Sequence, residues 1–165
     1  MNNWHQQHAA RTSLNYNEIV AAAAAHVAEV ETEICNPVAA ADYLRPIFAN
    51  ALQEEVWVIC LTAKNTVINC EMVTRGLVDR SQAHAREVFR AAIASNACKV
   101  MLAHNHPSGN PAPSAQDIAA TRALIAAGVI IGIPLMDHII VGRRTPGRYT
   151  DYVSMREAGL LEVAK

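Results

Sequence analysis

A short apolar run that passes directly into a histidine-rich loop constrains this chain more than any other feature. The run is CKVMLA (98–103), and HNHPSGNPAPSAQD (104–117) follows it. Such a run is typical of a buried strand, and the loop of Pro, Gly and Asn is typical of a fixed turn. Ser114 then begins a helical pattern. The chain must therefore place a buried strand, a rigid loop and a helix in immediate succession.

The other apolar patterns predict an α/β fold with a single mixed sheet flanked by helices. Residues 1–14 are polar and unpatterned, and we expect a flexible tail. Residues 15–52 carry two helical stripes, the second of which begins at Asn36-Pro37 as N-cap and first helical residue. Residues 53–165 form the α/β domain. In it we expect strands at 56–61, 66–76, 98–103, 135–142 and 149–153, helices at 84–95 and 114–127, a helix stop at Gly128, and a last short helix begun by a capping box at Ser154.

Composition limits the class of protein. The chain has 165 residues, of which 52% are hydrophobic and 18% charged, as expected for one globular domain with a real core. A net charge of -1 argues against nucleic acid as a partner. No apolar run is long enough to cross a bilayer, and the first residues lack the apolar core of a signal peptide, so we expect a cytoplasmic protein. The four cysteines are spread out, without a CxxC pair that would indicate a cysteine-bound zinc.

The two histidines of the loop could form part of a metal site. In an extended backbone, His104 and His106 project to the same side, because side chains at i and i+2 do so. Neutral imidazoles are good zinc ligands, but zinc needs at least a third. Asp117 could supply it across the loop. Three protein ligands leave the fourth position open to water, as in catalytic zinc sites.

Another interpretation explains part of the same motif. Ser114 with an acid at Asp117 is also the pattern of a capped helix start, in which the serine satisfies free N–H groups and the acid suits the helix dipole. The two interpretations are compatible, because a capped helix start is a rigid platform for a ligand.

The complete pattern resembles a known family. His104-x-His106, seven residues, Ser114, two residues and Asp117 is the HxHx(7)SxxD pattern of the JAMM metallopeptidases, which are the catalytically competent MPN domains. The similarity is to the RadC-like branch and runs from about Gln53 to Leu161. It includes EVWVICLTAKN, TRGLVD, HAREVF, MLAHNHPSG, MDHIIVG and SMREAGLL, in that order.

The resemblance implies a cytidine-deaminase-like JAMM/MPN fold, here with two leading helices, and one Zn²⁺ ion. It implies His104, His106 and Asp117 as ligands, and Ser114 as a group that stabilises the oxyanion. The implied reaction is hydrolysis of a peptide or isopeptide bond in an unknown peptide or protein, by zinc-activated water and a glutamate general base.

Several residues compete for the supporting roles. The family places its glutamate at the start of EVWVICL, so we expect Glu55 as the base, with Glu54 second. Only one of the two can face the metal, because successive strand residues face opposite sides. Glu71 is a third candidate. The family pattern also includes Asp137 and His138, which could orient a ligand histidine, although His138 is equally typical of a satisfied core histidine.

Two other functions stay open on sequence grounds. The family is traditionally associated with DNA repair, which suggests a DNA-repair accessory protein, although the charge and the lack of a glycine-centred helical hairpin argue against DNA binding. A non-catalytic module that keeps the zinc fold for binding is the other alternative. Thr62, Leu77 and Ala85 depart from the family pattern and leave the substrate surface open. The sequence also leaves a homo-oligomer open.

Overall fold

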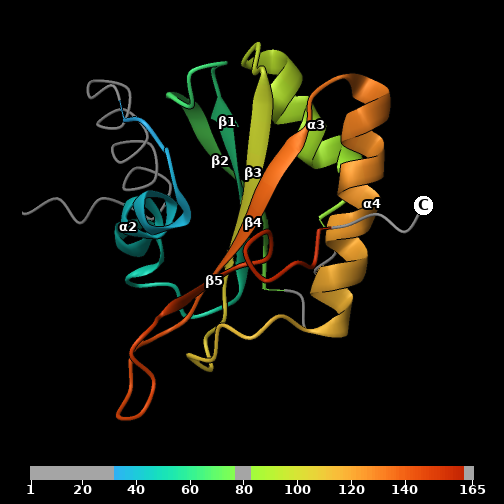
Figure 1. The fold of residues 1–165 in the computed structure, drawn as a ribbon. Helices are drawn as coiled ribbons and strands as arrows, with labels where there is room; N and C mark the ends of the chain where they lie inside the picture. Colours follow the sequence, from blue (N-terminus) through green and yellow to red (C-terminus); the bar gives the residue numbers. More distant parts are fainter. Residues whose placement is uncertain (1–31, 77–82, 162–165) are drawn as a thin grey trace, which may run out of the picture.

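A five-stranded mixed sheet with helices on both faces forms the body of the molecule (Figure 1). The computed structural model describes residues 32–76 and 83–161. Outside these ranges lie the expected flexible tail and nearly all of the first expected helix. Residues 77–82, which belong to the part of the sequence that resembles the family, also lie outside them. In chain order, the elements are α2 (Pro37–Phe48), β1 (Glu55–Leu61), β2 (Val67–Arg75), α3 (Ala85–Ala94), β3 (Lys99–Asn105), α4 (Ala115–Ile131), β4 (Leu135–Val141) and β5 (Tyr152–Ser154).

The strands are ordered β2-β1-β3-β4-β5 across the sheet. β3 lies in the centre, antiparallel to β1 and parallel to β4. A parallel pair needs a crossover connection, and α4 provides it between β3 and β4. The expected single mixed sheet is therefore confirmed.

Each face of the sheet has its own apolar layer, because side chains alternate along a strand. Val56, Val58 and Cys60 of β1 point toward α3 and α4. Trp57 and Ile59 point the other way and pack with α2. Figure 1 shows α2 on one side of the sheet and α3 with α4 on the other. The side chains of β3 divide between the same two layers, so the histidine-rich segment begins at the end of a strand that is covered on both faces.

The sequence predicts the starts of α2, α3 and α4 well, but it misplaces the end of α4 and predicts a last helix that the structure does not contain. Asn36 caps α2 by accepting a hydrogen bond from Ala39 N at 2.8 Å, as predicted. The expected stop at Gly128 is wrong, because α4 continues to Ile131 and ends at Gly132, which has the left-handed φ of 81°. The expected last helix is also wrong. Glu157 N does bind the Ser154 hydroxyl, but residues 155–159 form turns.

Among the residues that the structure describes, no helix combines the length and the apolar character needed to cross a membrane.

Candidate metal centre

His104 and His106 lie together at the end of β3. Their Nε2 atoms are 2.9 Å apart, as the alternation of strand side chains predicts. His104 is buried, whereas His106 is partly exposed. Two imidazole lone pairs at this separation repel each other unless a proton or a cation lies between them. The pair therefore needs either a proton or a metal cation between the two nitrogens.

Asp117 completes a group of three donors from the first turn of α4. Its Oδ1 lies 3.5 Å from His104 Nε2, and its Oδ2 lies 3.7 Å from His106 Nε2. One ligand atom from each of the three residues lies within 4.8 Å of the others. Two imidazole nitrogens and one carboxylate oxygen are a donor set that zinc accepts, with room for a further ligand. These residues could therefore hold a metal ion.

The loop between the histidines and α4 is tied to its surroundings. His106 N donates to Val141 O at 2.9 Å, and Arg143 N donates to Gly109 O at 2.9 Å. Gly109 has a φ of 79°, a backbone conformation that residues other than glycine rarely adopt. His106 Nδ1 lies 2.7 Å from Asn110 O, to which it can only donate. Nε2 of His106 is then left for a metal ion or, without one, for the proton that must lie between it and His104 Nε2.

Ser114 and Asp117 form the predicted helix cap as well as part of the site. Asp117 N donates to Ser114 Oγ at 3.1 Å, and Ser114 N donates back to Asp117 Oδ2 at 2.7 Å. The Ser114 hydroxyl donates to the same Oδ2 at 2.6 Å. Oδ2 is thus well supplied with donors, whereas Oδ1 faces His104. The hydroxyl of Ser114 orients the carboxylate here, and its expected role at an oxyanion stays a prediction that requires this hydroxyl to rotate.

Burial and mutual contact shift the pKa values of these groups in different directions. Burial lowers the pKa of His104 to about 4, against the opposing charge of Asp117. The hydrogen bond with Asp117 raises the pKa of His106 more than burial lowers it. Burial alone would raise the pKa of Asp117, but its bonds with His106 and Ser114 and the charge of His104 bring that pKa well below its usual range. At neutral pH the site therefore offers neutral His104 and an ionised carboxylate.

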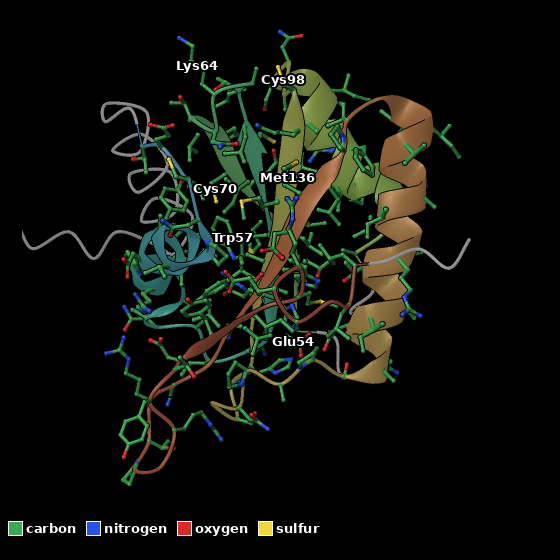
Figure 2. The ribbon with its side chains drawn as sticks, viewed as in Figure 1. Glu54, Trp57, Lys64, Cys70, Cys98 and Met136 are labelled. Atoms are coloured by element: carbon green, nitrogen blue, oxygen red, sulfur yellow. The ribbon has the colours of Figure 1, made fainter. Side chains whose placement is uncertain are left out.

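The register between β1 and β3 decides which of the two adjacent glutamates faces the imidazoles. Val56 pairs with His104, so the residue two positions before it, Glu54, lies on the same face of the sheet. The charge of Glu54 also contributes to the raised pKa of His106, after larger effects from Asp117, burial and Asn110. Figure 2 labels Glu54 at the lower end of the sheet, while Trp57 lies on the α2 side. The geometry thus favours Glu54, the second candidate from the sequence.

Glu55, the first candidate, faces the α2 side. Its Oε2 accepts a hydrogen bond from Trp57 Nε1 at 3.1 Å, and its Oε1 lies 3.0 Å from Arg75 Nε. Burial raises the pKa of Glu55, against the effect of the bond from Trp57. These contacts are those of a buried structural acid. The third candidate, Glu71, forms an ion pair with Arg90 on α3.

Asp137 and His138 occupy different positions. His138 Nε2 lies 2.7 Å from His104 Nδ1, so His138 directly contacts a candidate ligand. Asp137 instead accepts hydrogen bonds from its neighbour's backbone N–H, from the Ser154 hydroxyl and from Arg156 N. It holds the turn that follows β5.

Sequence reasoning missed Thr121, whose hydroxyl oxygen lies 2.6 Å from His138 Nδ1. The available signal was its position four residues after Asp117, which places both on one face of α4.

Comparison with known proteins adds independent information. Residues 34–160 match the model of a family described as the RadC-like JAB domain. The chain is 48% identical over 129 residues to a UPF0758 protein of Symbiobacterium thermophilum, an alignment that covers 78% of this chain and 53% of the relative. It is 35% identical over 135 residues to a UPF0758 protein of Methanosarcina barkeri, covering 82% and 56% respectively. A UPF0758 protein of Thermotoga maritima is 49% identical over 109 residues, covering 66% and 46%. The chain thus spans about half the length of the curated relatives it matches.

Proposed function

Since the chain belongs to the RadC-like JAB domain family, we propose that it is a zinc-dependent hydrolase that cleaves a peptide or isopeptide bond. The convergence of His104, His106 and Asp117, with Glu54 on the same face of the sheet, carries this proposal. Its substrate is a peptide or protein segment. The chemistry of the site supports this class of reaction, because two imidazoles, one carboxylate and a neighbouring glutamate are the parts that metal-assisted amide hydrolysis needs.

The residues would divide the work as follows. His104 and His106, through Nε2, and Asp117, through a carboxylate oxygen, would hold the ion. Zinc supplies a Lewis acid that polarises a carbonyl and lowers the pKa of a bound water to roughly 7. Glu54 would accept the proton of the attacking water and return it to the leaving amine. Ser114 would keep Asp117 in place through its hydroxyl.

The adjacent glutamates offer a matched test of the base. Glu54→Gln should keep a wild-type zinc content and lose about 100-fold or more of the hydrolysis rate, because general base catalysis contributes about that much. Glu55→Gln removes the same charge on the opposite face and should keep most of the rate. Hydrolysis is measured on a pool of fluorogenic peptides and on peptides joined through a lysine Nε isopeptide bond. Zinc is measured in the same samples by elemental analysis.

The two readouts separate two ways of being wrong. A reversed result, in which Glu55→Gln is inactive and Glu54→Gln is active, would overturn the choice of base but not the hydrolase. A wild-type protein that fails to take up zinc, even with metal added, would remove the hydrolase proposal itself.

A further inference from the structure

A chain of buried polar groups runs from His104 through β4 and back into α4. His104 Nδ1 lies 2.7 Å from His138 Nε2, and His138 Nδ1 lies 2.6 Å from Thr121 Oγ1. Thr121 Oγ1 in turn lies 2.6 Å from the main-chain carbonyl oxygen of Asp117. His104, Thr121 and His138 are each 2% exposed or less. Water therefore does not compete for these groups, and each must satisfy the next.

The direction of this chain follows from its last member. A carbonyl oxygen can only accept, so the Thr121 hydroxyl donates to Asp117 O. The hydroxyl has one proton, which leaves its oxygen to accept from His138 Nδ1. Met155 Sδ, at 3.5 Å, is a more distant and weaker acceptor for the same proton. The backbone carbonyl of Asp117 thus determines, through the Thr121 hydroxyl, which nitrogen of His138 carries the proton.

We propose that Thr121 is a positioning residue that sets the tautomers of His138 and His104 and so presents the Nε2 lone pair of His104 to the metal. Neutral His138, protonated at Nδ1, accepts at Nε2 from His104 Nδ1–H. Neutral His104 then has no proton on Nε2. The role in metal binding rests on the proposed function, but the tautomers do not.

The opposite direction would block the site. If His138 carried its proton on Nε2, it would donate to His104 Nδ1, and neutral His104 would carry its proton on Nε2. That proton would occupy the position where His104 meets His106 and Asp117. Residues that hydrogen-bond to a metal-bound histidine fix its tautomer and ring orientation in this way. Mutation of such a residue typically costs about 10- to 100-fold in metal affinity.

The test compares Thr121→Val with Thr121→Ser in the full chain. Valine keeps the shape of threonine but removes the hydroxyl, whereas serine keeps the hydroxyl. Histidine tautomers are measured on the metal-free proteins by long-range ¹H–¹⁵N correlation spectra, and zinc affinity by competition with a chelator. We expect Nδ1–H on His104 and His138 in the wild type and the serine variant. Thr121→Val should shift His104 toward Nε2–H and weaken zinc binding by about 10-fold or more.

Either of two results would overturn the proposal. One is an Nε2–H tautomer of His104 in the metal-free wild type, which needs no variant and so does not depend on whether Thr121→Val folds. The other is a folded Thr121→Val protein with wild-type tautomers and wild-type zinc affinity. Correct tautomers in a protein that binds no zinc would instead contradict the proposed function and leave the tautomer assignment standing.

Discussion

Asp117 has two tasks, and its two carboxylate oxygens divide them. Oδ2 receives the hydrogen bonds of Ser114, which belong to the helix cap, while Oδ1 faces His104. The cap and the candidate ligand are therefore the same side chain. A substitution that keeps the oxygen of the cap but removes the charge separates the two tasks.

Asp117→Asn should lose metal far more than it loses stability. Asparagine can still accept from Ser114, so the free energy of unfolding of the metal-free protein should fall by less than about 1 kcal/mol. Zinc per chain, measured by elemental analysis, should fall from near one to a small fraction, because a neutral amide is a poor zinc ligand. Ser114→Ala is the comparison: it should cost about 1 kcal/mol of stability, and it should lower the zinc content less than Asp117→Asn does, because it disturbs the orientation of the carboxylate but keeps its charge. Full zinc occupancy in Asp117→Asn would remove Asp117 from the ligand set.

For single residues, the sequence predicts the three candidate metal ligands but does not decide which glutamate faces them. His104, His106 and Asp117 lie within one local motif, whose strand, loop and helix start can be predicted from neighbouring residues. The choice between Glu54 and Glu55 depends on the register of two strands about fifty residues apart in the chain. Alternation predicts that only one of them faces the imidazoles, but register is set by tertiary packing.

The helix α4 shows the same distinction for an element. Its start was predicted correctly because the cap is formed by side chains three residues apart. Its end was predicted wrongly because Gly128 has a packing role rather than a terminating one. A Cβ at Gly128 would lie 2.6 Å from Ile133 O and 3.2 Å from Phe89 Cζ. The glycine allows the helix to approach α3 and the chain that leads into β4.

Gly128→Ala should therefore destabilise the protein although alanine favours helices by about 1 kcal/mol. The close contact with Ile133 O should outweigh that gain and leave a net loss of about 1–3 kcal/mol, measured by urea unfolding. Ala126→Gly, at an exposed position of the same helix, is the control and should cost about 1 kcal/mol. A Gly128→Ala protein more stable than the wild type would show that the packing yields easily.

For the whole molecule, the sequence predicts an α/β domain with a single mixed sheet and the family to which the chain belongs, and both are confirmed. The mixed sheet follows from apolar runs that alternate with helical stripes, which are local signals. Burial of the histidines in that sheet, in contrast, has an effect on the whole domain. It couples the stability of the entire domain to pH.

The metal-free protein should lose stability as pH falls from about 6.5 to about 4. The pKa of His104 is lowered to about 4 in the folded protein, whereas unfolded histidine has a pKa of about 6.5. Between these values the unfolded chain binds a proton that folded His104 does not, so unfolding is favoured by up to about 3 kcal/mol at the acid end. The pKa of His138 is lowered as well, by burial first, and acts in the same direction.

Urea unfolding at a series of pH values measures this loss. His104→Gln, which cannot titrate at this position, is the control and should show a shallower dependence over the same range. An equal slope in the two proteins would show that other groups cause the effect. Asp117, whose folded pKa lies below that of the unfolded chain, contributes only at lower pH, where its stabilising charge is lost.

The contacts of Gly109 have a consequence for how chains of this kind can change in length. The carbonyl oxygen of Gly109 accepts hydrogen bonds from Arg143 N and from the Arg148 side chain. Both sides of the 142–148 turn are therefore bonded to the ligand loop, which is the segment between His106 and Ser114. Gly142 packs so closely against Gly109 that a side chain there would displace the loop. Residues added at the exposed tip, between Pro146 and Gly147, would leave both attachments in place. The surface of the molecule can therefore be extended at this tip without moving the ligand loop.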